Sequence, residues 1–396
     1  MKIKALAITD RGIEPVTAEE IKEMTGCKAE SRDSCVSFDA ELDDILKFTY
    51  MTQSSDRVLA LLASFSFRDE DDLLKKAEVG VGKLGAENLK LWFSNSSTFR
   101  VDCERRGVHE FGSQSVEPGI GDIIGARVKK ELSLEPGVDL KNPDATIYLF
   151  LNNDQAYIGV DLAGRDLSKR HYRIFTSPGT VNAKIAFAIG RMAGFGPKKR
   201  MVDLYSKAGI ISIEAALHAN NISVNFYNKD FSFKKLPGLK ERDWDSFFKK
   251  IDSKKKSDEL EITAFDSQLR NVEATKKNAK LAGVDKLFKA SKMDLDWMDV
   301  KLDESGVDLV VSRIACPSNH HAEGMVKKVY KELFHQAEFF LKSGGKLCLL
   351  GENLALLRES ITKDFKIAEE KRIWGGQMEY EFIILERVEK EALFKE

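Results

Sequence analysis

From about residue 180 onwards, short apolar runs alternate with segments whose apolar residues recur at helical spacing. The apolar runs predict strands at 200–205, 223–228, 260–266, 307–312, 345–351 and 379–387. Helical spacing predicts helices at 183–195, 209–221, 268–283, 323–344 and 352–365. Apolar strands that alternate with amphipathic helices are typical of a parallel, doubly wound sheet. A short turn at 372–377 predicts an antiparallel hairpin at one edge, which gives a seven-stranded α/β arrangement.

The first 165 residues have a different pattern, in which strands and helices are shorter and less regularly ordered. Strands are predicted at 2–9, 33–40 and 57–67, and helices at 17–26 and 41–53. A second unit follows, with a strand around Val101, a helix at 119–132 and a β-hairpin at 145–164. The chain is therefore expected to be α/β, with an N-terminal α+β region ahead of the doubly wound region.

Composition limits the class of protein and its partners. The net charge is -1, so any surface that binds nucleic acid must be a local basic face. The five cysteines include no C-x-x-C pair, so neither a disulfide framework nor a metal site is expected. The N-terminus does not resemble a signal peptide, and no apolar run is long enough to span a membrane. A cytoplasmic protein without a membrane partner is expected.

Three stretches carry a resemblance to a known family. They are "FRVDCERRGVHEFGSQSVEPGIGDII" (99–124), "VDLAGRDLSKRHYR" (160–173) and "DFSFKKLPGLKERDWDSF" (230–247). Together they resemble the THUMP-domain RNA methyltransferases, and most closely the subgroup that methylates the exocyclic N2 of guanine in tRNA or rRNA. The resemblance implies a ferredoxin-like subdomain, a THUMP domain, a linker and a class I Rossmann-like seven-stranded methyltransferase domain, at 1–68, 69–165, 166–180 and 181–396. It also implies S-adenosylmethionine as cofactor and RNA, above all tRNA, as partner.

Basic residues gather around the predicted joint between the THUMP domain and the linker. In the family this region grips the acceptor end of tRNA, and Arg and Lys side chains there would donate to phosphate oxygens. The other interpretation is that these are ordinary solvated charges on turns. The candidate RNA-binding residues are Arg105, Arg106, His109, Lys169, Arg170 and Arg173, with His171 among them.

The stretch "VDLYSKAGI" (202–210) resembles the family's cofactor loop, in which an acidic residue after the first strand precedes a Gly-x-Gly turn. Asp203 and Gly209 match this pattern, whereas Lys207 stands where the family has the first glycine. A lysine there adds bulk and a positive charge near a ligand that already carries a sulfonium, so weaker cofactor binding is expected. The resemblance further places Asp266 at the ribose hydroxyls and Asp294 near the adenine amine. The alternative is that such acids cap neighbouring helices.

The stretch "VDLVVSRIACPSNHH" (307–321) lies where the family has Asn or Asp, two prolines and an aromatic residue. Arg313 and Cys316 occupy the first and last of these positions, so the motif is absent. Arginine has five donors and no acceptor, and it cannot accept a hydrogen bond from an exocyclic amine. Cys316 could instead be a nucleophile toward cytosine C5, or a buried structural cysteine. Other nearby groups that could act as acceptor or base are Ser312, Ser318, Asn319, His320 and His321.

Two functions are compatible with these patterns. The first is S-adenosylmethionine-dependent methylation of guanine N2 in tRNA, with Asp203, Gly209, Asp266 and Asp294 around the cofactor. The second is a catalytically silent relative that binds RNA or a partner protein through the same surfaces, since both the cofactor turn and the catalytic loop depart from the family. A cytosine methyltransferase that uses Cys316 is a third possibility.

Overall fold

The computed structural model describes residues 2–319 and 321–388. The chain forms two compact units, each assembled from segments that are not contiguous in sequence. Unit 1 comprises the residues up to Thr9 together with Thr17–Leu167 and Asn228–Ser253. Unit 2 comprises Asp10–Val16, Ser168–Tyr227 and the residues from Lys254 onward.

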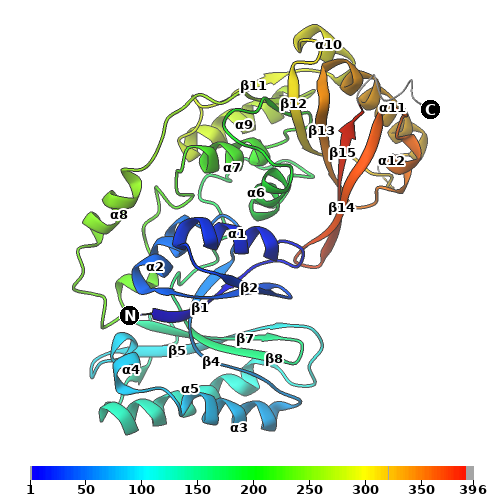
Figure 1. Ribbon diagram of the computed structural model, residues 1–396. Helices are drawn as coiled ribbons and strands as arrows, with labels where there is room; N and C mark the ends of the chain where they lie inside the picture. The colour runs from blue at the N-terminus through cyan, green and yellow to red at the C-terminus, as the bar shows by residue number, and fades with distance from the viewer. Residues whose placement is uncertain (1, 320, 389–396) are drawn as a thin grey trace. The chain divides into compact units, whose positions relative to one another are not determined.

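Unit 1 is built on an eight-stranded sheet with the order β2-β3-β1-β4-β8-β7-β5-β6 (Figure 1). Its strands are β1 (Lys2–Ile8), β2 (Ala29–Arg32), β3 (Cys35–Glu41), β4 (Arg57–Ser66), β5 (Thr98–Arg106), β6 (Gly137–Val138), β7 (Ala145–Asn152) and β8 (Gln155–Asp161). Antiparallel pairing of β4 with β8 joins the first three predicted strands and the predicted hairpin into one sheet. The strands expected at 2–9, 33–40 and 57–67 and the hairpin at 145–164 are thereby confirmed.

The helices of unit 1 enclose a core to which a distant part of the sequence contributes. They are α1 (Glu14–Thr25, of which the residues from Thr17 belong here), α2 (Leu42–Met51), α3 (Glu70–Val81), α4 (Ala86–Trp92), α5 (Ser113–Leu132) and α8 (Trp244–Asp252), with a short 3-10 turn η1 (Ser232–Lys234). Phe231, Phe233 and Phe248 from the insertion at 228–253 pack in this core with Tyr50. The rings of Tyr50 and Phe248 lie 4.8 Å apart. The insertion is therefore an integral part of unit 1.

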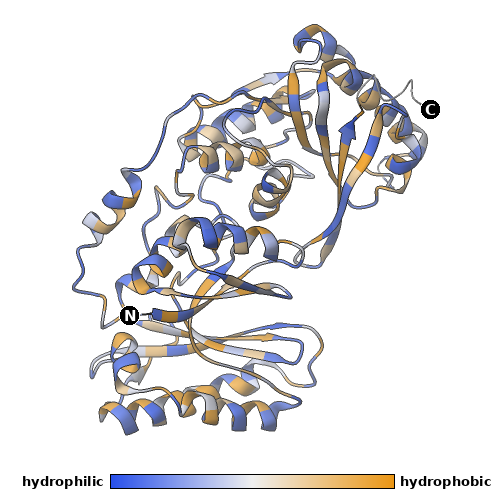
Figure 2. Cartoon of the chain, viewed as in Figure 1, coloured by the Kyte–Doolittle hydropathy of each residue, from blue (hydrophilic) through white to orange (hydrophobic). Residues whose placement is uncertain are grey.

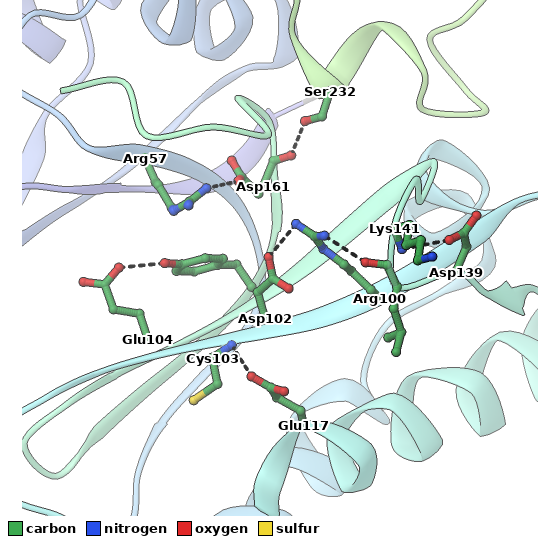
Figure 3. Close-up of polar contacts among 12 residues, drawn as sticks. Arg57, Arg100, Asp102, Cys103, Glu104, Glu117, Asp139, Lys141, Asp161 and Ser232 are labelled. Atoms are coloured by element: carbon green, nitrogen blue, oxygen red, sulfur yellow. Dashed lines mark hydrogen bonds and ion pairs between the residues drawn. The ribbon is translucent and has the colours of Figure 1, made fainter. Parts of the chain in front are cut away.

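The insertion is held to the sheet at the end of β8 (Figure 3). Asp161, at the end of β8, is 1% exposed and pairs with Arg57 of β4. The hydroxyl of Ser232 donates to the main-chain carbonyl of Asp161 at 2.6 Å. Because a buried carboxylate without a partner is strongly unfavourable, Arg57 stabilises Asp161, whose main-chain carbonyl holds Ser232 of the insertion.

Unit 2 contains a seven-stranded sheet with the order β11-β10-β9-β12-β13-β15-β14. Its strands are β9 (Met201–Asp203), β10 (Ile262–Asp266), β11 (Lys289–Lys292), β12 (Val307–Arg313), β13 (Leu341–Gly351), β14 (Phe365–Gly375) and β15 (Met378–Arg387). β15 runs antiparallel to β13 and β14, whereas the other paired strands are parallel. The predicted doubly wound sheet with an antiparallel hairpin at one edge is confirmed.

Helices cover both faces of this sheet (Figure 1). They are α6 (Ala183–Met192), α7 (Ile210–Ala219), α9 (Leu269–Ala282), α10 (Met298–Lys301), α11 (Glu323–Phe340) and α12 (Ala355–Ser360), with a short 3-10 turn η2 (Leu295–Trp297). Successive strand residues face opposite cores: Met201 packs with α6, α7 and α9, and Val202 packs with α10, α11 and α12. Figure 2 shows the apolar character of the central strands that this double coverage requires.

One strand prediction is wrong. Residues 224–227 form turns, and the outer strand of the sheet is instead β11, whose four residues carry little apolar signal. The hydroxyl of Ser223 accepts a hydrogen bond from the main-chain N–H of Asn225 at 3.0 Å, and the Ser223 carbonyl accepts from Phe226. This local hydrogen bonding competes with strand pairing, while Val224 is still buried against the core.

No helix within the described residues has both the length and the apolar character needed to cross a lipid bilayer.

Candidate functional site

The carboxyl ends of β10, β9 and β12 lie next to one another in unit 2, and the predicted site residues gather there. The chain passes from β9 to β10 on one side, and later returns with β12 on the other side of β9. In open α/β sheets ligands bind at such a switch point. Asp203 ends β9, Asp266 ends β10 and Arg313 ends β12, so the sheet brings together three residues that are far apart in the sequence.

The turn between β9 and α7 has two left-handed residues, Lys207 (φ 52) and Gly209 (φ 78). Glycine is required at 209 for a second reason, because a Cβ there would lie 2.5 Å from Cγ2 of Thr275. Lys207 adopts the glycine-like conformation despite its side chain, which costs about 1 kcal/mol. Its ammonium group forms no ion pair with any residue that the structure describes.

Asp266 is held in a fixed orientation by three N–H donors. The main-chain N–H of Lys207 donates to Oδ2 at 3.0 Å, and the main-chain N–H of Gln268 and the side-chain amide of Asn271 donate to Oδ1 at 2.9 Å each. A carboxylate offers about four lone-pair directions, so Asp266 retains acceptor capacity. By this count about one acceptor direction, on Oδ2, remains for a hydroxyl group of a ligand.

Asp203 is fully buried and only half satisfied. Its Oδ1 accepts a hydrogen bond from the hydroxyl of Ser312 at 2.7 Å, whereas its buried Oδ2 has no partner among the described residues. Burial, reinforced by the nearby Asp266, raises the pKa of Asp203 to about 7. Buried polar atoms almost always have a partner, so the orphaned oxygen marks a place where a ligand donor fits.

Asp294 lies at the same edge of the sheet, two residues after β11 and directly before η2. Its side chain is exposed, and its carbonyl accepts a hydrogen bond from the main-chain N–H of Trp297. This position on the rim is compatible with the predicted adenine contact, which stays a prediction.

Arg313 uses its guanidinium to connect three segments of unit 2. Nη1 donates to the carbonyl of Gly179 at 2.6 Å, and Nη2 pairs with Oε1 of Glu352, the residue that follows β13. The guanidinium also lies 5.4 Å from the ring centre of Tyr380. Arg313 therefore positions its neighbours, and Glu352 is a carboxylate at the catalytic edge that the sequence motif did not reveal.

The other candidates from the stretch 307–321 lie in different environments. Cys316 packs against the core formed by α11, and a Cβ on Gly351 would lie 2.6 Å from its sulfur. Ser312 is buried and bonded to Asp203. Of these candidates, Ser318, Asn319 and His321 are exposed, while His320 lies outside the described residues.

The candidate RNA-binding side chains of unit 1 form hydrogen bonds and ion pairs with other residues of the same unit. Arg105 donates to the hydroxyl of Ser113 and to a main-chain carbonyl. Arg106 pairs with Glu104 and Asp56. The His109 ring forms a hydrogen bond with the main-chain carbonyl of Asn153 at 2.8 Å and stacks on the ring of Phe67. These bonds order the loop after β5, and only Arg105 has an exposed side chain.

A cavity of about 980 Å³ beside this loop is acidic. Its lining contains five carboxylates against one arginine and one histidine, which makes it unfavourable for phosphate. The charged lining residues are Arg68, Asp69, Glu70, Asp71, His109, Glu110 and Asp154.

The structure corrects the prediction for Arg170. Its guanidinium donates to both carboxylate oxygens of Glu214, at 2.8 and 3.1 Å, and the two side chains are 1% and 0% exposed. The hydroxyl of Tyr172 donates to the same carboxylate at 2.5 Å. Arg170 is thus part of a buried network that cannot reach RNA. Lys169 is exposed and Arg173 is half-buried.

Comparison with known proteins identifies the family. Residues 170–379 match the family model described as the RMKL-like methyltransferase domain, which is more than half of the chain. The chain belongs to this family. Residues 86–161 match the THUMP domain, and residues 4–59 match the RlmL ferredoxin-like domain. The resemblance inferred from the sequence motifs is confirmed.

The relatives of this RMKL-like protein include RNA methyltransferases. It is 24% identical over 381 residues to the tRNA (guanine(6)-N2)-methyltransferase of Methanocaldococcus jannaschii, covering 93% of this chain and 96% of that protein. It is 26% identical over 293 residues to the ribosomal RNA large subunit methyltransferase K/L of Photobacterium profundum. That match covers 73% of this chain and 40% of the relative, so the chain spans well under half of that protein.

Two solved structures show the same fold. SMU.472, solved in complex with SAH, superposes with a TM-score of 0.80 at 21% identity, and the match covers 97% of each chain. TrmN from Thermus thermophilus superposes with a TM-score of 0.69 at 20% identity, covering 98% of this chain and 100% of its own. The architecture of ferredoxin-like and THUMP regions ahead of a methyltransferase domain is therefore established.

Proposed function

We propose that this protein transfers a methyl group from S-adenosylmethionine to the exocyclic N2 of guanine in a tRNA. The observation that carries this proposal is made at the carboxyl edge of β9 and β10, where Oδ2 of Asp203 has no partner among the described residues and the nearby carboxylate of Asp266 is held in a fixed orientation. The match to an archaeal tRNA guanine-N2 methyltransferase along almost the whole chain supports this choice of substrate.

The residues at this edge of the sheet suit an adenosyl cofactor. Asp266 would accept a hydrogen bond from a ribose hydroxyl with its remaining acceptor direction, and Asp203 would accept one from a cationic or N–H donor. The cofactor supplies an electrophilic methyl group on a sulfonium. Lys207 adds a positive charge beside this site, so we expect weaker affinity than a glycine would give.

The acceptor that is missing at position 313 is supplied, in this proposal, by Glu352. An exocyclic amine that takes up a methyl group must release a proton, and it is oriented by an acceptor for its N–H bonds. Arg313 holds Oε1 of Glu352, while Oε2 has no hydrogen-bond partner among the described residues. The pair thus presents a carboxylate oxygen at the edge of the sheet where the family has its Asn or Asp.

Methyl transfer by the purified protein tests the proposal. With S-adenosylmethionine and unmodified tRNA, the wild type should form N2-methylguanosine, detected by mass spectrometry of the nucleosides. Glu352→Ala should lose transfer and retain RNA binding, whereas Glu359→Ala, which removes an exposed carboxylate of α12, should retain both. If the wild type binds tRNA and transfers no methyl group, the protein is a binding module and the proposal fails. Formation of 5-methylcytosine that is lost in Cys316→Ala would identify a different reaction.

A further inference from the structure

A surface of unit 2 exposes several apolar and aromatic side chains side by side. We define the α9 platform as His171, Ile174, Phe175, Tyr227 and Leu281. Four of these are more exposed than is usual for large apolar residues: Ile174 at 63%, Tyr227 at 60%, Phe175 at 38% and Leu281 at 37%.

Contacts show that the α9 platform is continuous. The ring of His171 lies 5.8 Å from that of Tyr227, and its Nε2 lies 3.3 Å from the carbonyl of Leu281. The main-chain N–H of Phe175 donates to Asn278 of α9 at 3.1 Å, and Asn278 donates back to the Phe175 carbonyl. The segment that precedes α6 and the last turns of α9 therefore present one surface.

The Tyr227 ring is held at this surface by the end of α9. A Cβ on Gly283, the residue that follows α9, would lie 2.6 Å from the Tyr227 hydroxyl. The absence of a side chain at position 283 therefore leaves room for the ring. The Tyr227 and Phe226 rings are nearly perpendicular, and their centres lie 4.9 Å apart.

Positive charge surrounds these rings. Nζ of Lys277 lies 5.0 Å from the ring centre of Phe175, and Nζ of Lys255 lies 4.6 Å from that of Phe226. α9 carries four basic residues and one acidic residue. The exposed lysines of α9, which are Lys276, Lys277 and Lys280, form no ion pair with a described residue, so their charge is available to a ligand.

We infer that the α9 platform binds unpaired nucleotides of an RNA, with bases stacked on Tyr227 and Phe175 and phosphates beside the α9 lysines. Aromatic rings among unpaired lysines suit single-stranded RNA, because each base offers a face for stacking and each phosphate a charge. A protein partner fits less well, since lysine is depleted from protein interfaces. The inference rests on the proposed function, because it assigns RNA binding to unit 2.

Fluorescence anisotropy with a short, labelled single-stranded RNA and a labelled tRNA transcript tests this inference. Tyr227→Ala should weaken binding of both by roughly tenfold, and Tyr227→Phe should restore it because the stacking face is retained. Log affinity falls as log salt concentration rises, and replacing the three α9 lysines by glutamine should make this slope less steep by about 2. Matched controls are Ile367→Ala, an exposed apolar residue on β14, and glutamine at three exposed lysines of α11, Lys327, Lys328 and Lys331.

The possible failures are distinguishable. If the wild type binds RNA and Tyr227→Ala binds it equally well, the platform is not the RNA site, while the proposed function stands. If the wild type binds neither RNA, both the inference and the proposed function fail. If Tyr227→Ala leaves RNA binding intact but abolishes association with a co-purified protein, the platform is a protein interface and the inference is overturned.

Discussion

Replacing Asp203 by asparagine should remove a pH-dependent loss of stability. Asp203 is fully buried, and its pKa is raised from 3.8 to about 7, first by burial. The folded protein therefore holds the Asp203 proton more tightly than the unfolded chain does. The stabilisation from this proton is complete below about pH 4 and is lost as the pH rises through about 7. Asparagine keeps an oxygen for the Ser312 hydroxyl and does not titrate.

The expected magnitude follows from the size of the shift. A shift of about three pKa units corresponds to about 4 kcal/mol, at about 1.4 kcal/mol for each unit. The amide nitrogen of the variant would occupy the place of the orphaned Oδ2, which adds an unfavourable term that is the same at every pH. The free energy of unfolding of Asp203→Asn, relative to wild type, should thus rise by up to about 4 kcal/mol between pH 4 and pH 8.

Urea unfolding of both proteins at several pH values measures this difference. All other titrating groups are shared, so their effects cancel when the two proteins are compared at the same pH. A difference that is constant from pH 4 to pH 8 would show that Asp203 ionises normally in the folded protein. In that case the surroundings of Asp203 are better hydrated than the geometry indicates, and Oδ2 of Asp203 would not mark a ligand site.

Three further substitutions test the structure around the site. Gly209→Ala should lower the melting temperature, because it combines a left-handed conformation with a clash against Thr275, and Thr275→Ala should restore part of the loss. Lys207→Gly should tighten binding of S-adenosylmethionine several-fold in calorimetry, and more than that of S-adenosylhomocysteine, which lacks the sulfonium charge; a loss of affinity would instead identify Lys207 as a ligand contact. Arg170→Ala should destabilise the protein by about 3 to 5 kcal/mol in urea unfolding by removing the arginine that neutralises the buried Glu214 carboxylate, and the double variant with Glu214→Leu should recover stability.

The order of strands and helices could be predicted because it depends on local periodicity. The helix at 209–221 and the strand at 307–312 have the expected type and nearly the expected ends, as α7 and β12. The prediction of a strand at 223–228 is wrong because the Ser223 hydroxyl accepts a hydrogen bond that closes a turn. Hydrophobicity alone does not reveal this turn. β11 was missed because its sequence is mostly polar, although it pairs with β10 along its whole length.

The site could be predicted only in part, since side-chain partners come from distant positions. Acids at strand ends follow from the strand pattern, so Asp203 and Asp266 could be proposed from sequence. The basic residues next to Arg170 in the sequence favour an RNA contact, but its partner Glu214 lies 44 residues away. Glu352 has no motif of its own, and it becomes a candidate only when Arg313 is seen to hold it.

The most direct test of the account is calorimetric titration of the purified protein with S-adenosylmethionine. The carboxyl edge of β9 and β10 predicts saturable binding with a dissociation constant in the micromolar range, and Asp266→Ala should abolish this binding. Absence of binding to the wild type, or binding that Asp266→Ala leaves unchanged, would contradict the assignment of this edge as the cofactor site.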